Sequence, residues 1–209
     1  MTTQFRIEKD SLGEGQVPCD ALYGVQTVRA AQNFPITHLR THPAMIRSLG
    51  MIKKACAMAN HECGHLDDER TGYIIAACDE IIQGKLDCWF ITDVIQGGAG
   101  TSTNMNANEV ISNLAIEHLG GKLGDYSIVN PNNDANFGQS TNDTYPTAIH
   151  LSCILRSNVL IKAAEELRDA LYAKAKEFDQ TLKMGRTHLQ DAVPMTLGQE
   201  FHGWGLHYQ

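Results

Sequence analysis

PTAIHLSCILRSNVLIKAAEELRDALYAKAKEF, residues 146–178, contains no glycine and has proline only at its first position. Apolar residues recur through it in helical steps of three, four and seven, at Ile149, Cys153, Leu160, Ala164, Leu167, Leu171, Ala175 and Phe178. Pro146 fits the first turn of such a helix, where its missing N–H is not needed. The helix would be about 50 Å long at 1.5 Å per residue, more than a small globular core covers. The segment therefore predicts a helix bundle completed by other subunits.

Three polar stretches lie where helical segments begin or end: GGAGTSTN (97–104), QSTND (139–143) and KMGRTHLQD (183–191). They combine hydroxyls, carboxamides and one imidazole, and a helix N-terminus adds about half a positive charge without any Lys or Arg. This composition favours a site for a small carboxylate. Ordinary helix capping is the alternative interpretation, because Ser, Thr and Asn are preferred N-cap residues.

The first stretch is expected to lead into a helix over residues 105–119. A nucleotide-binding site is an alternative, because residues 90–95 could form a strand before the glycines. The pattern fails in detail, since the sixth position counted from Gly98 is Thr103 rather than Gly, and no Gly-Lys-Ser/Thr follows.

The third stretch is expected to be a loop between two helices. Gly185 suits the position just after a helix C-terminus, and a new helix is predicted from about Thr196, after Pro194. His188 is the only side chain of the three stretches that titrates near neutral pH.

The rest of the chain predicts a hairpin-like start over residues 5–18 and helices near residues 43–63 and 67–83. With 43% hydrophobic residues the chain can bury a core. We expect an N-terminal domain over residues 1–139 and the incomplete first part of a helical-bundle domain over residues 140–209.

The charge and apolar pattern exclude several classes of protein. A formal charge of −7 disfavours nucleic acid or an anionic membrane as partner. No apolar run approaches the roughly 20 residues that span a bilayer, and residues 1–6 lack a signal-peptide core, so a cytoplasmic location is expected.

Six scattered cysteines are expected to be reduced core residues. The only metal-like cluster, residues 61–65 (HECGH), is not followed by a second ligand pair at zinc-site spacing. We therefore expect neither a metal nor a cofactor.

The motifs resemble the fumarase/aspartase superfamily across essentially the whole chain. The resemblance is carried by residues 97–109 (GGAGTSTNMNANE), 139–146 (QSTNDTYP) and 183–201 (KMGRTHLQDAVPMTLGQEF), together with the opening residues 5–33. It implies a mainly α, L-aspartase/fumarase-like fold, with a small N-terminal domain followed by the start of a long helical bundle.

Three local features favour the aspartase (ammonia-lyase) branch over class II fumarases. Fumarases typically carry Gln at the position of Ser102, a second Ser at that of Thr141, and His-Pro-Asn-Asp where this chain has residues 130–133 (NPNN). Residues 134–138 (DANFG) depart from relatives, and we assign them no role. A class II fumarase and a non-catalytic oligomerisation module remain as alternatives.

The resemblance implies reversible elimination of ammonia from L-aspartate to give fumarate, through an aci-carboxylate dianion. It places Thr101, Ser140 and Thr141 around the carboxylate beside the acidic carbon. It places Asn142, Thr187 and His188 at the amino group or leaving ammonia, with Thr187 and His188 as the catalytic pair.

The resemblance also implies a homotetramer in which each active site draws the three motif stretches from three subunits. Family members carry a serine general base in a mobile loop, with a Lys and an Asn for the second carboxylate, in a later portion that lies outside these 209 residues. We therefore expect no lyase activity from this chain alone.

Overall fold

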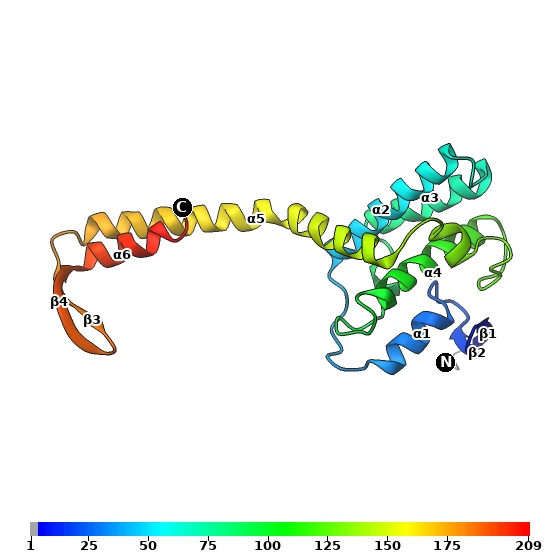
Figure 1. The fold of residues 1–209 in the computed structure, drawn as a ribbon, viewed down its shortest axis with the longest axis horizontal. Coiled ribbons are helices and arrows are strands. Elements are labelled where there is room, and N and C mark those ends of the chain that lie inside the picture. Colours follow the sequence, from blue (N-terminus) through cyan, green and yellow to red (C-terminus); the bar gives the residue numbers. More distant parts are fainter. Residues whose placement is uncertain (1–3) are drawn as a thin grey trace. The chain divides into compact units, whose positions relative to one another are not determined.

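A computed structural model describes residues 4–209, which form two compact units that meet between Cys153 and Ile154. The first unit contains the hairpin β1 (Phe5–Asp10) and β2 (Gly13–Pro18), helices α1 (Val25–Asn33), α2 (Pro43–Glu62), α3 (Asp68–Ile82) and α4 (Thr101–His118), the short turns η1 (Asp87–Trp89) and η2 (Pro131–Ala135), and the start of α5 (Thr141–Glu177). The second unit contains the rest of α5, the hairpin β3 (Leu182–Thr187) and β4 (Gln190–Thr196), and α6 (Leu197–Leu206) (Figure 1). The mainly α fold is confirmed, whereas the predicted domain division at residue 139 stays a prediction.

The predicted hairpin and the first two long helices are confirmed. β1 and β2 pair antiparallel, with Phe5 opposite Pro18. Pro43 occupies the first turn of α2, and the His42 ring accepts a hydrogen bond from Ala44 N. The Asp67 side chain caps α3 by accepting from Arg70 N at 2.8 Å. These are local signals that a sequence displays directly.

The core of the first unit lies between α2, α3 and α4, which pack against one another (Figure 1). Its fully buried large side chains include Ile46, Leu49, Ile74, Ile81, Phe90, Ile111 and Ile116. Most of α4 is buried, polar residues included, so this helix is the central element to which the rest of the unit is attached.

The buried carboxylate of Glu109 joins α4 to the N-terminus of α1. It accepts hydrogen bonds from Gly24 N (2.9 Å), Gln26 N (3.0 Å), Thr27 N (3.0 Å) and Thr27 Oγ1 (2.6 Å). Burial raises the pKa of Glu109, although these hydrogen bonds act in the opposite direction. One side chain thus satisfies the otherwise unpaired N–H groups at the start of α1.

The start of α4 differs from the prediction. The helix begins at Thr101, before the expected residue 105, because positive φ angles at Gly98 (69°), Ala99 (50°) and Gly100 (92°) turn the chain directly into it. Gly100 provides no side-chain cap; instead Gln96 Oε1 accepts from Thr103 N at 2.8 Å. The capping interpretation of this stretch is therefore wrong. Residues 90–95 form no strand, only a bridge between Arg40 and Asp93.

Both ends of α5 also differ from the prediction. The helix begins at Thr141, so Pro146 lies in its second turn rather than its first, and the C=O of Asn142 loses the N–H that another residue would supply. The helix ends at Glu177, well before Gly185.

The expected loop over residues 186–191 is the tip of a hairpin. Gly185 is a buried residue of β3 rather than the end of a helix, and His188 and Leu189 form the turn with φ of 49° and 64°. Two positive φ angles are typical of the tight turn whose twist matches the paired strands. The helix predicted from Thr196 is confirmed, and Thr196 and Gln199 form a capping box.

The cysteines are free, but most lie outside the core. Only Cys78 is buried and Cys56 is half-buried, whereas Cys19, Cys63, Cys88 and Cys153 are exposed because they lie at element ends, in turns or on an uncovered face of α5. The expectation of core cysteines is therefore wrong for these four. In the metal-like cluster, His61 Nε2 lies 2.6 Å from Asp68 Oδ1.

No helix within residues 4–209 is long and apolar enough to cross a membrane.

Candidate functional site

The first polar stretch presents hydroxyls at the N-terminus of α4. Thr101 is exposed, and its Oγ1 donates to Gly98 O at 2.5 Å. Ser102 is half-buried, and the next two residues, Thr103 and Asn104, turn into the core. The helix therefore displays two hydroxyl side chains at its positive end and holds two polar side chains beneath them.

Buried polar side chains fix the backbone that leads into this stretch. Asp93 accepts from Thr37 N and Thr37 Oγ1 (both 2.7 Å) and from His38 N and Ile95 N (both 2.8 Å). Burial would raise the pKa of Asp93, but the hydrogen bonds from Ile95, Thr37 and His38 outweigh it and hold that pKa well below its usual range. Asp93 is therefore a charged anchor for the segment before Gly97.

The second polar stretch lies at the N-terminus of α5. Ser140 and Asn142 are exposed and Thr141 is half-buried. Asn142 N donates to Ser140 Oγ at 3.2 Å, so Ser140 caps the helix as the alternative interpretation predicted. Capping uses only an acceptor function of Ser140, and the hydroxyl proton is left for a ligand.

The N-termini of α4 and α5 are held against each other within one chain. Asn104 Nδ2 donates to Thr141 Oγ1 and Thr144 Oγ1 donates to Asn104 Oδ1, each at 3.2 Å. Gly100 faces the ring of Tyr145 so closely that a Cβ at this position would lie 2.3 Å from the ring. The first two stretches therefore meet within one subunit, and the expectation that all three come from different subunits is wrong for these two.

Sequence reasoning missed the buried residues that support this arrangement. Lys53 on α2 is completely buried, and its Nζ donates to Asn136 Oδ1 at 2.7 Å and Gln139 Oε1 at 2.8 Å. Burial lowers the pKa of Lys53 to about 7. The sequence did contain a signal for the burial of Lys53. Lys53 follows Leu49 by four residues and precedes Ala57 by four, which places it on the buried face of the helix. A lysine in an apolar stripe indicates a specific partner.

The third polar stretch lies in the second unit. Thr187 ends β3 and His188 begins the hairpin turn, and both are exposed. Among the described residues, neither side chain has a hydrogen-bond partner. The structure therefore groups Thr101, Ser140, Thr141 and Asn142 in one unit and places Thr187 and His188 in the other.

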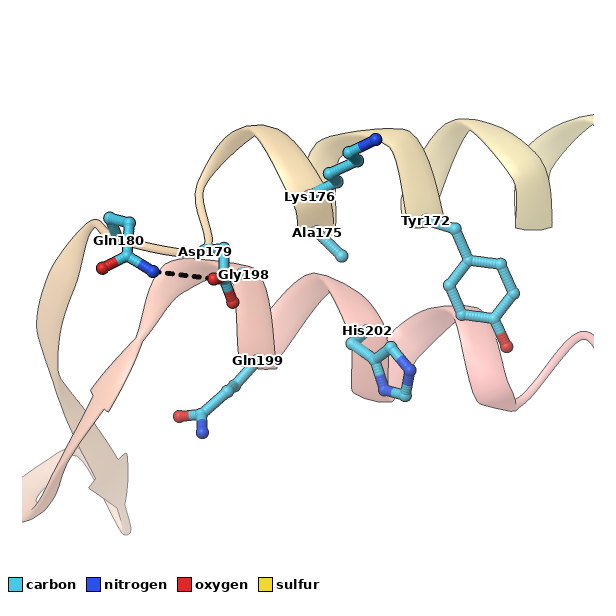
Figure 2. Close-up of a pocket in the computed structure, with 8 residues that line it drawn as sticks. All are labelled: Tyr172, Ala175, Lys176, Asp179, Gln180, Gly198, Gln199 and His202. Carbon is cyan, nitrogen blue, oxygen red and sulfur yellow. Dashed lines mark hydrogen bonds between the residues drawn. The ribbon is translucent and has the colours of Figure 1, made fainter.

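The second unit also contains a groove between the end of α5 and α6 (Figure 2). Its walls are Tyr172, Ala175, Lys176, Asp179, Gln180, Gly198, Gln199 and His202. The helices approach closely here because glycine stands at the contacts, where a Cβ on Gly198 would lie 2.4 Å from Ala175 O. None of the expected site residues lines this groove, so we do not regard it as the candidate site.

Comparisons with known proteins agree with the motifs. Residues 13–209 match the protein-family model described as "Lyase". The chain is 55% identical over 204 residues to an aspartate ammonia-lyase from Bacillus sp, covering 98% of this chain and 44% of that protein. It is 51% identical over 205 residues to a class II fumarate hydratase from Halobacterium salinarum, and the match covers 98% of this chain and 43% of that protein.

A solved structure shows the same likeness. It is the cobalt-bound fumarate lyase:delta crystallin from Brucella melitensis, with a TM-score of 0.88 and 50% identity over 98% of this chain and 45% of that one. The chain thus spans less than half the length of each of these relatives. The family match and the identities show that the chain belongs to the fumarase/aspartase superfamily of lyases.

Proposed function

We propose that this chain is part of an aspartate ammonia-lyase, which converts L-aspartate reversibly to fumarate and ammonia. The observation that carries the proposal is the hydrogen bond between Asn104 and Thr141, because it holds two hydroxyl-bearing helix N-termini together. Ser140 and Thr141 then supply O–H donors beside two positive helix ends, and the Thr101 hydroxyl joins them when its proton turns from Gly98 O to the ligand. Such a site binds a carboxylate without a cation in contact with it.

The reaction needs this kind of site. The proton leaves a carbon next to a carboxylate, so negative charge accumulates on a group that is already charged. Donors held in place before the reaction stabilise the resulting dianion, and losing one such donor typically costs about 3 kcal/mol. We assign Thr101, Ser140 and Thr141 to this carboxylate, and Asn142, Thr187 and His188 to the amino group or leaving ammonia.

The location of the third stretch supports a shared active site. Thr187 and His188 follow α5 in the chain, whereas Ser140 precedes it and Thr141 is its first residue, so nearly all of this 37-residue helix lies between the two groups in the sequence. We propose that the hairpin tip serves the site of another subunit in a homotetramer, that the enzyme acts in the cytoplasm, and that this chain alone has no measurable lyase activity.

A class II fumarase is the second candidate, favoured by the 51% identity to a fumarate hydratase. Ser102 and Thr141 support the ammonia-lyase instead. Ser102 is half-buried and lines a cavity with Arg29 and Asn33, so a larger side chain at this position would reduce that cavity.

The test is fumarate formation, followed by ultraviolet absorbance, from L-aspartate and separately from L-malate. The complete protein that carries this chain is assayed beside the 209-residue chain. Activity on aspartate alone supports the proposal, and activity on malate makes the protein a fumarase. If the complete protein forms no fumarate from either substrate, a non-catalytic oligomerisation module is favoured. Fumarate formation by the 209-residue chain alone contradicts its predicted inactivity.

A further inference from the structure

The buried Nζ of Lys53 determines how the amides around it are oriented. Lys53 has a pKa of about 7, and both its ammonium form and its neutral amine form carry at least two N–H groups to donate. Its Nζ lies 2.7 Å from Asn136 Oδ1 and 2.8 Å from Gln139 Oε1, so the oxygen of each amide, and not its nitrogen, faces Lys53.

The orientation of the Asn136 amide in turn fixes the orientation of the Asn104 amide. The same oxygen, Asn136 Oδ1, lies 3.1 Å from Asn104 Nδ2 and 3.2 Å from Asn108 Nδ2. Because Asn136 presents an acceptor, Asn104 must present its NH₂ group there. The oxygen of Asn104 then faces Thr144, whose Oγ1 lies 3.2 Å from it and 3.2 Å from Ser140 O, so these two acceptors share the single Thr144 proton. The contact with Thr144 is compatible with this orientation of Asn104, and the contact with Asn136 requires it.

The orientation of Asn104 determines whether Thr141 donates or accepts in the hydrogen bond between them. The second proton of Asn104 Nδ2 is donated to Thr141 Oγ1 at 3.2 Å, so Thr141 is the acceptor in that hydrogen bond. A threonine hydroxyl has a single proton. That proton is not used inside the protein by this contact and remains for a group outside it.

We propose that Lys53, acting through Asn136 and Asn104, fixes the direction of the Thr141 hydrogen bond so that the Thr141 hydroxyl donates its proton to a carboxylate of the bound substrate. Lys53 and Asn104 are positioning residues in this scheme, and Thr141 is the residue that contacts the substrate. The inference rests on the proposed function only in taking the ligand to be a dicarboxylate, which fumarase and ammonia-lyase share.

The test replaces Asn104 by a group of the same shape and opposite polarity. In the Asn104→Asp variant a carboxylate, which only accepts, faces Thr141, so the Thr141 proton turns inward toward it. We expect the dissociation constant for fumarate, measured by titration calorimetry on the complete protein, to increase at least tenfold. The control is Asn106→Asp, an equally buried position on α4 whose side chain contacts backbone groups of Trp89 and Ile91, and we expect at most a twofold change.

A double-mutant cycle separates this role from general damage. In the Thr141→Val background, which has no hydroxyl to orient, Asn104→Asp should change fumarate binding by no more than twofold. Equal weakening by Asn104→Asp with and without the Thr141 hydroxyl, or equal weakening by Asn106→Asp, would overturn the inference.

A second pair of variants tests the source of the orientation. Lys53→Met should weaken fumarate binding only when Thr141 is present. Lys54→Met, at the neighbouring residue that pairs with Asp79 on α3, should leave binding unchanged. If the unmodified protein binds fumarate and Lys53→Met does not alter that binding, the inference alone fails. If the unmodified protein does not bind fumarate, the proposed function fails and takes the inference with it.

Discussion

Replacement of Gly100 by alanine should destabilise the first unit through two separable effects. Gly100 has a φ of 92°, which an L-residue adopts at a cost of about 1–2 kcal/mol. The new Cβ would also lie 2.3–2.5 Å from ring atoms of Tyr145, and overpacking of this kind costs about 1–3 kcal/mol. Taken together these give about 3.5 kcal/mol, or a fall in the unfolding temperature of roughly 7–14 °C for a protein of this size.

Gly120→Ala is the matched control. Gly120 has a similarly positive φ, 73°, but nothing lies within 4 Å of an added Cβ, so only the backbone cost applies. We expect about 1.5 kcal/mol and a fall of roughly 3–6 °C, measured by circular dichroism during heating. Combining Gly100→Ala with Tyr145→Ala should recover part of the loss due to crowding. Equal effects at Gly100 and Gly120 would refute the close contact between the start of α4 and Tyr145.

Three further predictions concern single side chains. The pKa of Lys53 is about 7 in the folded protein and 10.5 in the unfolded chain, so the unfolded state binds more protons between these pH values. The free energy of unfolding, measured in urea, should therefore rise from pH 7 to 10, and Lys53→Met should reduce that rise. Glu109→Gln should lower the free energy of unfolding by about 2 kcal/mol or more, since an amide cannot accept all four hydrogen bonds at the start of α1. His188→Asn, which tolerates the positive φ of the turn, should reduce kcat of the complete enzyme roughly 100-fold or more, while its unfolding temperature stays within about 2 °C; unchanged kinetics would remove His188 from the site.

Elements with local signals could be predicted from the sequence. The Asp67 cap and the proline at the start of α2 are readable within a few residues, and α2 and α3 begin within one residue of the predicted positions. The helical period of residues 146–178 identified most of α5. The polar stretches also showed where hydroxyl groups would gather.

Elements that depend on distant contacts could not be predicted in the same way. The start of α4 depends on the positive φ angles at residues 98–100 and also on Gln96 and the ring of Tyr145, and no pattern within residues 97–104 reveals these last two contacts. Residues 182–196 resemble a loop because Gly185 and Pro194 interrupt them, whereas pairing between β3 and β4, with a bulge beside Gly185, makes them a hairpin. The role of Lys53 depends on Asn136, 83 positions later in the chain.

The two halves of the candidate site are built by different physical means. Around Thr141, buried side chains from α2, α4 and the turn before α5 fix donor directions before any ligand arrives, which is the condition under which donors contribute most to a charged transition state. Around His188 only the hairpin turn constrains the backbone, and the side chain is exposed. In the proposed shared site, the precise placement of His188 comes from packing against another subunit. Substitutions in the Lys53 network should accordingly act on carboxylate binding, whereas loss of subunit assembly should abolish the contribution of His188 and leave the Thr141 network intact.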